Sequence, residues 1–126
     1  MNGHKVLIID DHADTAEILT HFVERAGGSA TSASDGTAAL QMLRSDLPDA
    51  VVLDCHLPGL SGYDVLRAMR GDERLRAIPV LMYSADATPA NRDQAYDLGV
   101  QEYVVKGDIM WSSLLAKIAR LAGSLQ

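Results

Sequence analysis

Short apolar runs alternate along this chain with longer segments in which apolar residues recur at helical spacing. Four almost wholly apolar runs are typical of parallel strands buried on both faces, namely Val6–Ile9, Ala50–Leu53, Val80–Tyr83 and Tyr103–Val105. The segment Ser29–Ser34 is smaller and more polar, and it predicts a weak strand at an edge. This βαβ rhythm predicts an α/β fold with a five-stranded parallel sheet and helices on both faces.

Helical segments are expected after each strand. Gly27 and Gly28 end the first of them. The fourth begins with Thr88 as N-cap and Pro89 at the first helical position, and Gly99 follows its end. The five predicted helices cover 14–26, a short segment after the turn at 35–36, 63–70, 89–98 and 108–122.

Length and composition indicate an ordinary globular protein of one domain. The length of 126 residues fits one domain, which we expect to span 1–126 with a core at about 5–122. Hydrophobic residues make up 48% of the chain and charged residues 22%, as in ordinary globular proteins. A net charge of -6 argues against direct binding of nucleic acid. No targeting peptide or membrane span is evident, so we expect a cytoplasmic protein without a membrane partner.

The residues that follow the strands carry the candidate chemistry. The carboxyl ends of parallel strands meet at one edge of a sheet, which is where ligands bind in open α/β folds. The residues expected there are Asp10, Asp11, Asp54, Ser84 and Lys106. Crowded carboxylates repel one another unless a cation neutralises them, and oxygen ligands alone favour Mg²⁺. An Asp held between Mg²⁺ and a lysine can attack phosphorus, and Asp54 on a central strand is the best candidate.

As a set, these strand-end residues resemble the response regulator receiver domain, over about Lys5 to Leu121. The resemblance implies a doubly wound, flavodoxin-like sheet with strand order 2-1-3-4-5. It also implies that Asp54 accepts a phosphoryl group from a histidine kinase or a histidine phosphotransfer protein. Such a domain catalyses only its own phosphorylation and dephosphorylation, so it is not expected to be an enzyme with a separate substrate.

The same resemblance assigns a role to each site residue. Asp11, Asp54 and the backbone carbonyl of His56 would bind Mg²⁺ directly, whereas Asp10 would act mainly through a bound water. Lys106 would pair with a phosphoryl oxygen.

The resemblance also implies a switch. Ser84 would move toward the phosphoryl group, and Tyr103 would turn inward when it does. A downstream effector protein would then read the surface formed by the fourth helix, the fifth strand and the fifth helix.

The sequence departs from the family at Gly107, which stands where a proline preceded by a cis peptide bond is usual. A cis bond before a non-proline residue costs about 2.5–4 kcal/mol, so we expect a trans bond there. The departure keeps open an alternative, a degenerate receiver that binds proteins without being phosphorylated. Asp86, two residues past Ser84, lies at a position that varies in the family and often influences phosphate lifetime.

Other classes fit less well. A phosphatase of the haloacid dehalogenase type needs a second Asp two residues after its nucleophile, but His12 and His56 stand at that spacing. A flavodoxin-like cofactor binder would have a phosphate loop rich in Ser, Thr and Gly after the first strand, where this chain is acidic.

Several other residues have simpler interpretations. His12 and His56 are interpreted as loop residues rather than side-chain metal ligands. Cys55 is interpreted as a small packed hydrophobe. Four arginines interleaved with acids predict a solvated face, namely Arg67, Arg70, Arg74 and Arg76. Trp111 is either exposed for a partner or buried.

Overall fold

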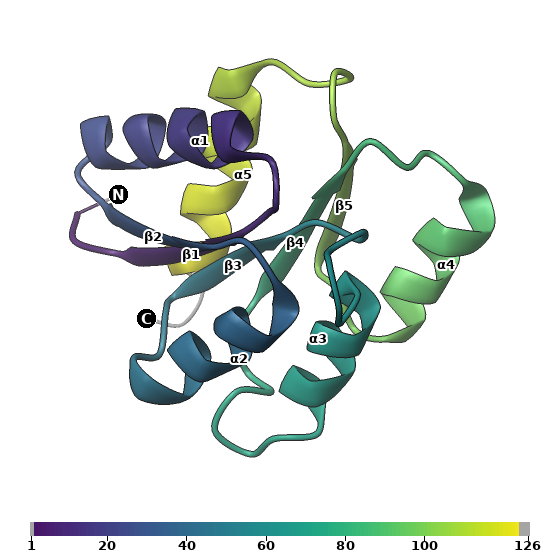
Figure 1. The fold of residues 1–126 in the computed structure, drawn as a ribbon. Helices are drawn as coiled ribbons and strands as arrows, with labels where there is room; N and C mark the ends of the chain where they lie inside the picture. Colours follow the sequence, from purple (N-terminus) through teal and green to yellow (C-terminus); the bar gives the residue numbers. More distant parts are fainter. Residues whose placement is uncertain (1, 124–126) are drawn as a thin grey trace.

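A computed structural model describes residues 2–123 of the chain. Within these residues the strands are β1 (Lys5–Ile9), β2 (Ser29–Ala33), β3 (Ala50–Leu53), β4 (Val80–Ser84) and β5 (Glu102–Val105). The helices are α1 (Ala13–Arg25), α2 (Gly36–Ser45), α3 (Gly62–Arg70), α4 (Pro89–Asp97) and α5 (Trp111–Gly123). The strands form one parallel sheet in the order β2-β1-β3-β4-β5, so the predicted fold class and strand order are confirmed (Figure 1).

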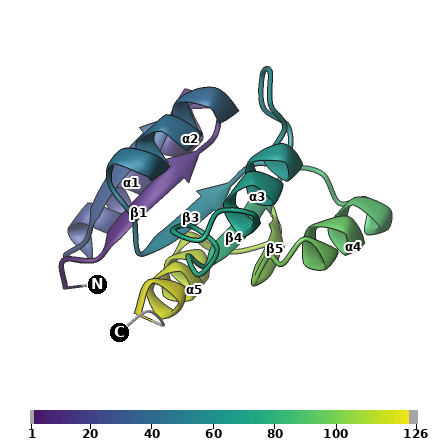
Figure 2. The ribbon, with the colours of Figure 1, turned by 90° about the horizontal axis from the view of Figure 1, so that it is seen from below.

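Helices cover both faces of the sheet. α1 and α5 lie on one face, and α2, α3 and α4 lie on the other (Figures 1 and 2). Successive residues of β1 point to opposite faces, as the period of a strand requires. Val6 and Ile8 therefore join the apolar cluster under α1 and α5, whereas Leu7 and Ile9 join the cluster under α2 and α3. This double burial explains why the central strands read as unbroken apolar runs.

Hydrogen bonding continues one residue past the ends of three strands and brings the candidate site residues to a common edge. Asp10 N–H donates to the Ala33 carbonyl at 3.1 Å, and Asp54 N–H donates to the Ile9 carbonyl at 2.9 Å. Lys106 N–H donates to the Ser84 carbonyl at 2.8 Å. The backbones of these residues are thus held by the sheet itself rather than by the loops that follow.

The C-terminal helix begins later than the sequence predicts. α5 starts at Trp111 instead of residue 108, because Gly107 adopts φ +90° and the N–H of Asp108 closes a turn onto the Val105 carbonyl at 3.1 Å. No peptide bond among residues 2–123 is cis, as expected for the bond before Gly107. Trp111 is 36% exposed and stacks on Phe22 of α1 at 5.9 Å between ring centroids. Among the described residues, no helix is both long and apolar enough to cross a bilayer.

Arg70 at the end of α3 does not belong to the solvated face that its sequence neighbourhood predicts. Its guanidinium donates to the carbonyls of Gly99 at 2.8 Å, Ile78 at 2.9 Å and Arg76 at 3.1 Å. It also donates to the Gln101 side chain at 3.1 Å, and Gln101 in turn accepts from the N–H of Val80 at 2.7 Å. Burial lowers the pKa of Arg70, yet the group stays charged at neutral pH. Arg70 therefore joins α3 to the starts of β4 and β5.

Replacing Arg70 with alanine is expected to destabilise the fold by about 2–3 kcal/mol, because several carbonyl groups lose a charged donor at once. Arg67→Ala is the matched control, since Arg67 makes one exposed ion pair with Asp64 and its loss should cost less than about 0.5 kcal/mol. Urea unfolding of both variants measures the difference. Equal losses in the two variants would contradict the role given to Arg70.

Candidate functional site

The turn from β1 into α1 supplies the first part of the site. Asp10 is the last residue held by the sheet, and its side chain is only 4% exposed. Asp11 follows with a side chain 35% exposed. His12 is the N-cap residue of α1, and its backbone N–H donates to Asp10 Oδ1 at 2.8 Å. The turn thus presents one buried and one partly exposed carboxylate beside each other.

β3 supplies the central carboxylate. The side chain of Asp54 is also 4% exposed, and its Oδ1 accepts from the backbone N–H of His56 at 3.4 Å. The loop after Asp54 returns to the sheet where Gly62 N–H donates to the Cys55 carbonyl at 2.8 Å. Gly62 lies so close to the strand that a Cβ atom there would overlap the carbonyl oxygen of Asp54. The packing of α3 against β3 therefore fixes the backbone that carries Asp54.

Lys106 links the two buried carboxylates. Its Nζ donates to Asp10 Oδ2 at 2.8 Å and to Asp54 Oδ2 at 3.2 Å. Burial acts to lower the pKa of Lys106, but the hydrogen bond and charge of Asp10 and the charge of Asp54 outweigh it and raise that pKa. The ammonium therefore remains charged across the physiological range. It neutralises only part of the negative charge of three neighbouring carboxylates.

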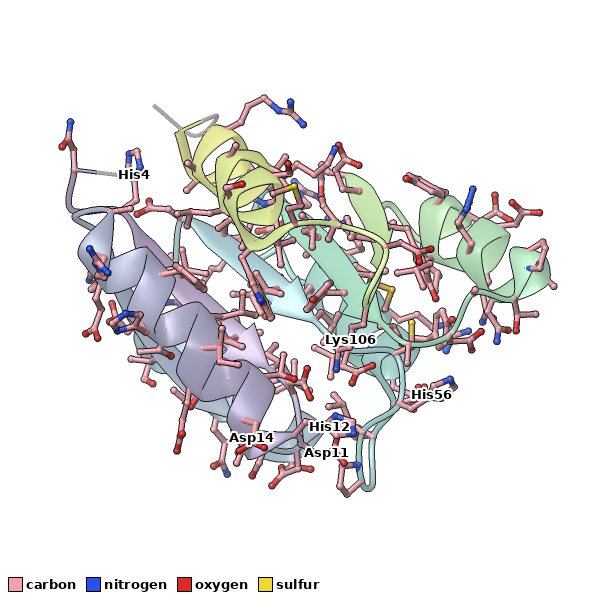
Figure 3. All side chains as sticks on the ribbon, turned by 90° about the horizontal axis from the view of Figure 1, so that it is seen from above. His4, Asp11, His12, Asp14, His56 and Lys106 are labelled. Atoms are coloured by element: carbon pink, nitrogen blue, oxygen red, sulfur yellow. The ribbon has the colours of Figure 1, made fainter. Side chains whose placement is uncertain are left out.

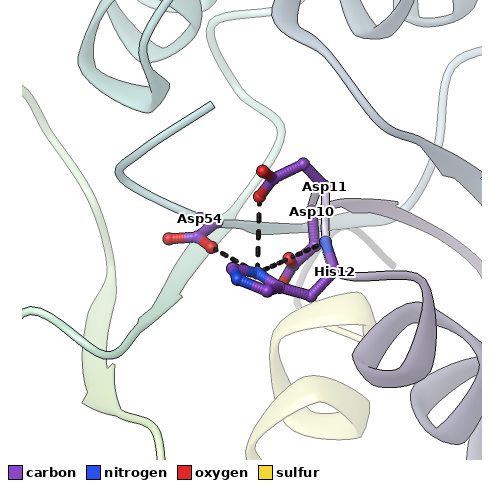
Figure 4. Close-up of side chains that lie close together, drawn as sticks. All are labelled: Asp10, Asp11, His12 and Asp54. Atoms are coloured by element: carbon purple, nitrogen blue, oxygen red, sulfur yellow. Dashed lines mark hydrogen bonds and ion pairs between the residues drawn. The ribbon is translucent and has the colours of Figure 1, made fainter. Parts of the chain in front are cut away.

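His12 lies in the turn before α1, as predicted, but its ring contacts the acidic cluster, where no side-chain nitrogen was predicted. Its Nδ1 lies 2.8 Å from Asp10 Oδ1, 3.3 Å from Asp11 Oδ1 and 3.6 Å from Asp54 Oδ2, so the ring faces all three acids (Figure 4). The hydrogen bond to Asp10 raises the pKa of His12. Its position directly after two strand-end acids was the available signal, but the direction of the ring depends on loop torsions that periodicity does not specify.

These residues could hold a metal ion. One ligand atom from each of Asp10, Asp11, His12 and Asp54 lies within 4.8 Å of the others. Figure 3 shows Asp11, His12, His56 and Lys106 at the same end of the molecule, whereas His4 lies at the opposite end. Asp10 and Asp54 are buried carboxylates that share one lysine, so their mutual repulsion is only partly relieved. A divalent cation would relieve the rest. The site therefore suits a divalent cation bound mainly by carboxylate oxygens.

His56 and Asp86 connect two loops beside this cluster. His56 Nε2 lies 2.8 Å from Asp86 Oδ2. The carboxylate of Asp86 also accepts from the N–H of Thr88 at 2.8 Å and from the side-chain amide of Asn91 at 2.7 Å. The hydrogen bonds from Thr88, His56 and Asn91 hold the pKa of Asp86 well below its usual range. Thr88 is the N-cap residue of α4 and makes no side-chain capping bond, so Asp86 holds the start of α4 through the backbone N–H of Thr88.

Ser84 and Tyr103, the two predicted switch residues, both contact Asp86. Ser84 is buried at the end of β4, and its hydroxyl oxygen accepts from the N–H of Asp86 at 3.3 Å. The side chain of Tyr103 is already turned inward in this structure, which differs from the expectation that it turns inward only when Ser84 moves. Its hydroxyl donates to the carbonyl of Asp86 at 2.6 Å. That hydroxyl also lies 3.4 Å from the thiol of Cys55, which is fully buried, as expected of a packed residue. One short loop thus joins Ser84 to Tyr103.

Comparison with known proteins agrees with this geometry. A family model described as the response regulator receiver domain matches residues 6–118. The chain is 44% identical over 103 residues to the chemotaxis protein CheY of Pseudomonas aeruginosa, which covers 81% of this chain and 83% of that protein. It is 39% identical over 103 residues to the chemotaxis protein CheY-3 of Vibrio cholerae, covering 81% of this chain and 79% of that protein.

Solved structures share the fold at lower sequence identity. The receiver domain of the Francisella response regulator 1452 has a TM-score of 0.89 and 26% identity, covering 98% of this chain and 100% of that one. The receiver domain of the sensor histidine kinase PA1611 from Pseudomonas aeruginosa has a TM-score of 0.86 and 26% identity, covering 97% of this chain and 99% of that one. The latter is described with a magnesium ion coordinated in its active site cleft. With the acidic cluster, the shared fold and these matches, the chain belongs to the family of two-component response regulator receiver domains.

Proposed function

We propose that this receiver domain accepts a phosphoryl group on Asp54 in a Mg²⁺-dependent reaction and that a histidine kinase or histidine phosphotransfer protein donates it. The observation that carries the proposal is the bridge from Lys106 Nζ to Asp10 and Asp54 at 2.8 and 3.2 Å. This bridge supports the proposal because the buried carboxylate of Asp54 lies beside a positive charge and next to a second acid. The domain would catalyse only this transfer and its reversal by water, with no separate substrate.

In the transfer, an oxygen of Asp54 forms a bond to phosphorus while the P–N bond of the donor phosphohistidine breaks. The donor imidazole leaves with the electron pair of that bond. Asp10, Asp11 and Asp54 would hold Mg²⁺, and the carbonyl of His56 remains a predicted ligand. When bound, the ion would supply positive charge to the phosphoryl oxygens during transfer. Lys106 would donate a hydrogen bond to a phosphoryl oxygen on Asp54, because its Nζ already lies 3.2 Å from the Asp54 carboxylate.

The loop after β4 offers a route from phosphorylation to the surface. A phosphoryl group brings three strong acceptors, so it favours rotation of the Ser84 hydroxyl toward Asp54. That rotation would break the contact from the N–H of Asp86 to Ser84, now 3.3 Å long. The carbonyl of Asp86 accepts from Tyr103, so movement of this loop would change the packing of α4 on β5. A downstream effector protein would read the α4, β5 and α5 face.

Titration of the protein with Mg²⁺ and beryllofluoride, followed by amide NMR, tests this proposal. We expect saturable shifts at Asp54 and Lys106, with further shifts at Ser84, Asp86 and Tyr103 that require beryllofluoride. Asp54→Asn should lose the beryllofluoride-dependent shifts while keeping a folded spectrum. If the wild-type protein showed no response to Mg²⁺ with beryllofluoride, the degenerate receiver would be the better account.

A further inference from the structure

The imidazole of His12 adds a nitrogen donor to a cluster of carboxylates. We propose that the site also binds borderline divalent cations such as Zn²⁺, with His12 Nδ1 as fourth ligand beside Asp10, Asp11 and Asp54. This inference rests on the proposed metal site and deepens it by naming a second class of ion. The sequence pattern predicted a site of oxygen donors only, and the orientation of His12 changes that donor set.

The separations around His12 Nδ1 are those of ligands that share a small ion. Tetrahedral Zn²⁺ with bonds of about 2.0–2.1 Å to nitrogen and oxygen places neighbouring ligand atoms about 3.3 Å apart. His12 Nδ1 lies 2.8, 3.3 and 3.6 Å from oxygens of Asp10, Asp11 and Asp54. The four ligand atoms lie within 4.8 Å of one another, so ion binding would draw them closer together. The partly exposed Asp11 side chain and the exposed His12 ring have room to move.

His12 is also held in this orientation before any ion binds. Its backbone N–H and its ring Nδ1 both contact Asp10 Oδ1 at 2.8 Å. A metal ion would take the place of the Nδ1 proton between ring and carboxylate. The ring is 63% exposed, so an ion can reach Nδ1 from solvent without opening the core. The His12 side chain does not cap α1, so metal binding by the ring would not cost the helix a capping hydrogen bond.

The donor set separates two kinds of ion. Mg²⁺ prefers octahedral oxygen ligands and keeps several waters, so it gains nothing from an imidazole. Zn²⁺ binds imidazole well and is stable with four protein ligands. Four protein ligands would fill its coordination shell and leave no position for a phosphoryl oxygen. Bound Zn²⁺ would therefore compete with Mg²⁺ and hold the domain in a form that does not accept phosphate.

Binding of ZnCl₂, CoCl₂ and MgCl₂ to the purified chain tests the inference. We expect His12→Ala to weaken Zn²⁺ binding by about 10-fold or more in calorimetry and to leave Mg²⁺ binding within about 2-fold of wild type. Co²⁺ should give the intense visible absorption of a tetrahedral site in the wild-type protein, and His12→Ala should lose it. His21→Ala is the matched control, because His21 is an exposed histidine on the same helix and lies outside the cluster.

Two outcomes would overturn the inference. One is equal Zn²⁺ affinity in wild type and His12→Ala, and the other is a weak octahedral Co²⁺ spectrum that does not depend on His12. If Mg²⁺ and beryllofluoride still bind in that case, the proposed function stands and only the role of His12 fails. If neither Mg²⁺ nor Zn²⁺ binds to the wild-type protein, the proposed metal site fails as well.

Discussion

Gly62→Ala is expected to lower the free energy of unfolding by roughly 3 kcal/mol and the Tm by roughly 10 °C. A Cβ atom at this position would overlap the carbonyl oxygen of Asp54 and lie 2.9 Å from the Cα of Cys55. Both obstacles are backbone atoms of a buried segment, so neither can move as a side chain would. The gain in helix propensity from Gly to Ala, at most about 1 kcal/mol, is too small to compensate. Thermal and urea unfolding measure the loss.

Gly71→Ala is the matched control at the other end of the same helix. Gly71 has φ -86°, and an added Cβ would lie 3.4 Å from the Arg67 carbonyl, at a distance where little adjustment is needed. Its unfolding free energy should stay within about 0.5 kcal/mol of wild type. The added Cβ atom would displace the backbone of Asp54. The Gly62→Ala molecules that remain folded should therefore also bind beryllofluoride more weakly than wild type. A Gly62→Ala protein as stable as Gly71→Ala would contradict the close approach of α3 to β3.

Lys106→Met is expected to have the second large effect. It keeps a long apolar side chain but leaves Asp10 and Asp54 without the ammonium that now bonds to both. Losing one partner of a buried pair costs about 3–5 kcal/mol, and we expect about 2 kcal/mol here because the lysine side chain is 18% exposed. Mg²⁺ should restore more stability to this variant than it adds to wild type, since the carboxylates then lack another cation.

The pH dependence of this difference follows from the pKa of Lys106. That pKa is raised in the folded state, mainly by Asp10 and Asp54, which together outweigh the effect of burial. The stabilisation is therefore complete below the ordinary lysine pKa of about 10.4 and is lost as the pH rises through the folded-state value. Wild type and Lys106→Met should differ by the full amount from pH 7 to about 10, and they should converge only as the pH rises past the ordinary lysine pKa of about 10.4 and through the folded-state value. Lys117→Met, which removes a more exposed lysine paired with Glu102, should lose less than about 1 kcal/mol.

The sequence predicts the strands, and the edge of the sheet at which the site residues lie, because both follow from the periodicity of apolar residues. Unbroken apolar runs required burial on both faces, and the residue after each run had to lie at the carboxyl end of the sheet. That reasoning placed Asp10, Asp54 and Lys106 at one edge, where they now lie in contact. The resemblance supplied the strand order, which the runs alone do not specify.

Features that depend on loop torsions and single side-chain directions were beyond this reasoning. The predicted start of α5 is three residues early. The left-handed conformation of Gly107 delays the helix, and the sequence does not specify that conformation. His12 is the N-cap residue of α1, and its exposed ring faces the acids, a direction that no spacing rule describes. Arg70 looked like one of four solvated arginines, yet its hydrogen-bond partners lie in the segments just before β4 and β5.

Intact-protein and peptide mass spectrometry after incubation with acetyl phosphate and Mg²⁺ tests the central claim most directly. The account predicts an added mass of about 80 Da on the wild-type chain, located on the peptide that contains Asp54. The adduct should be absent from Asp54→Asn and absent when the metal is removed with a chelator. A wild-type protein that gains no such mass under these conditions, or an Asp54→Asn variant that gains it equally, would contradict the account.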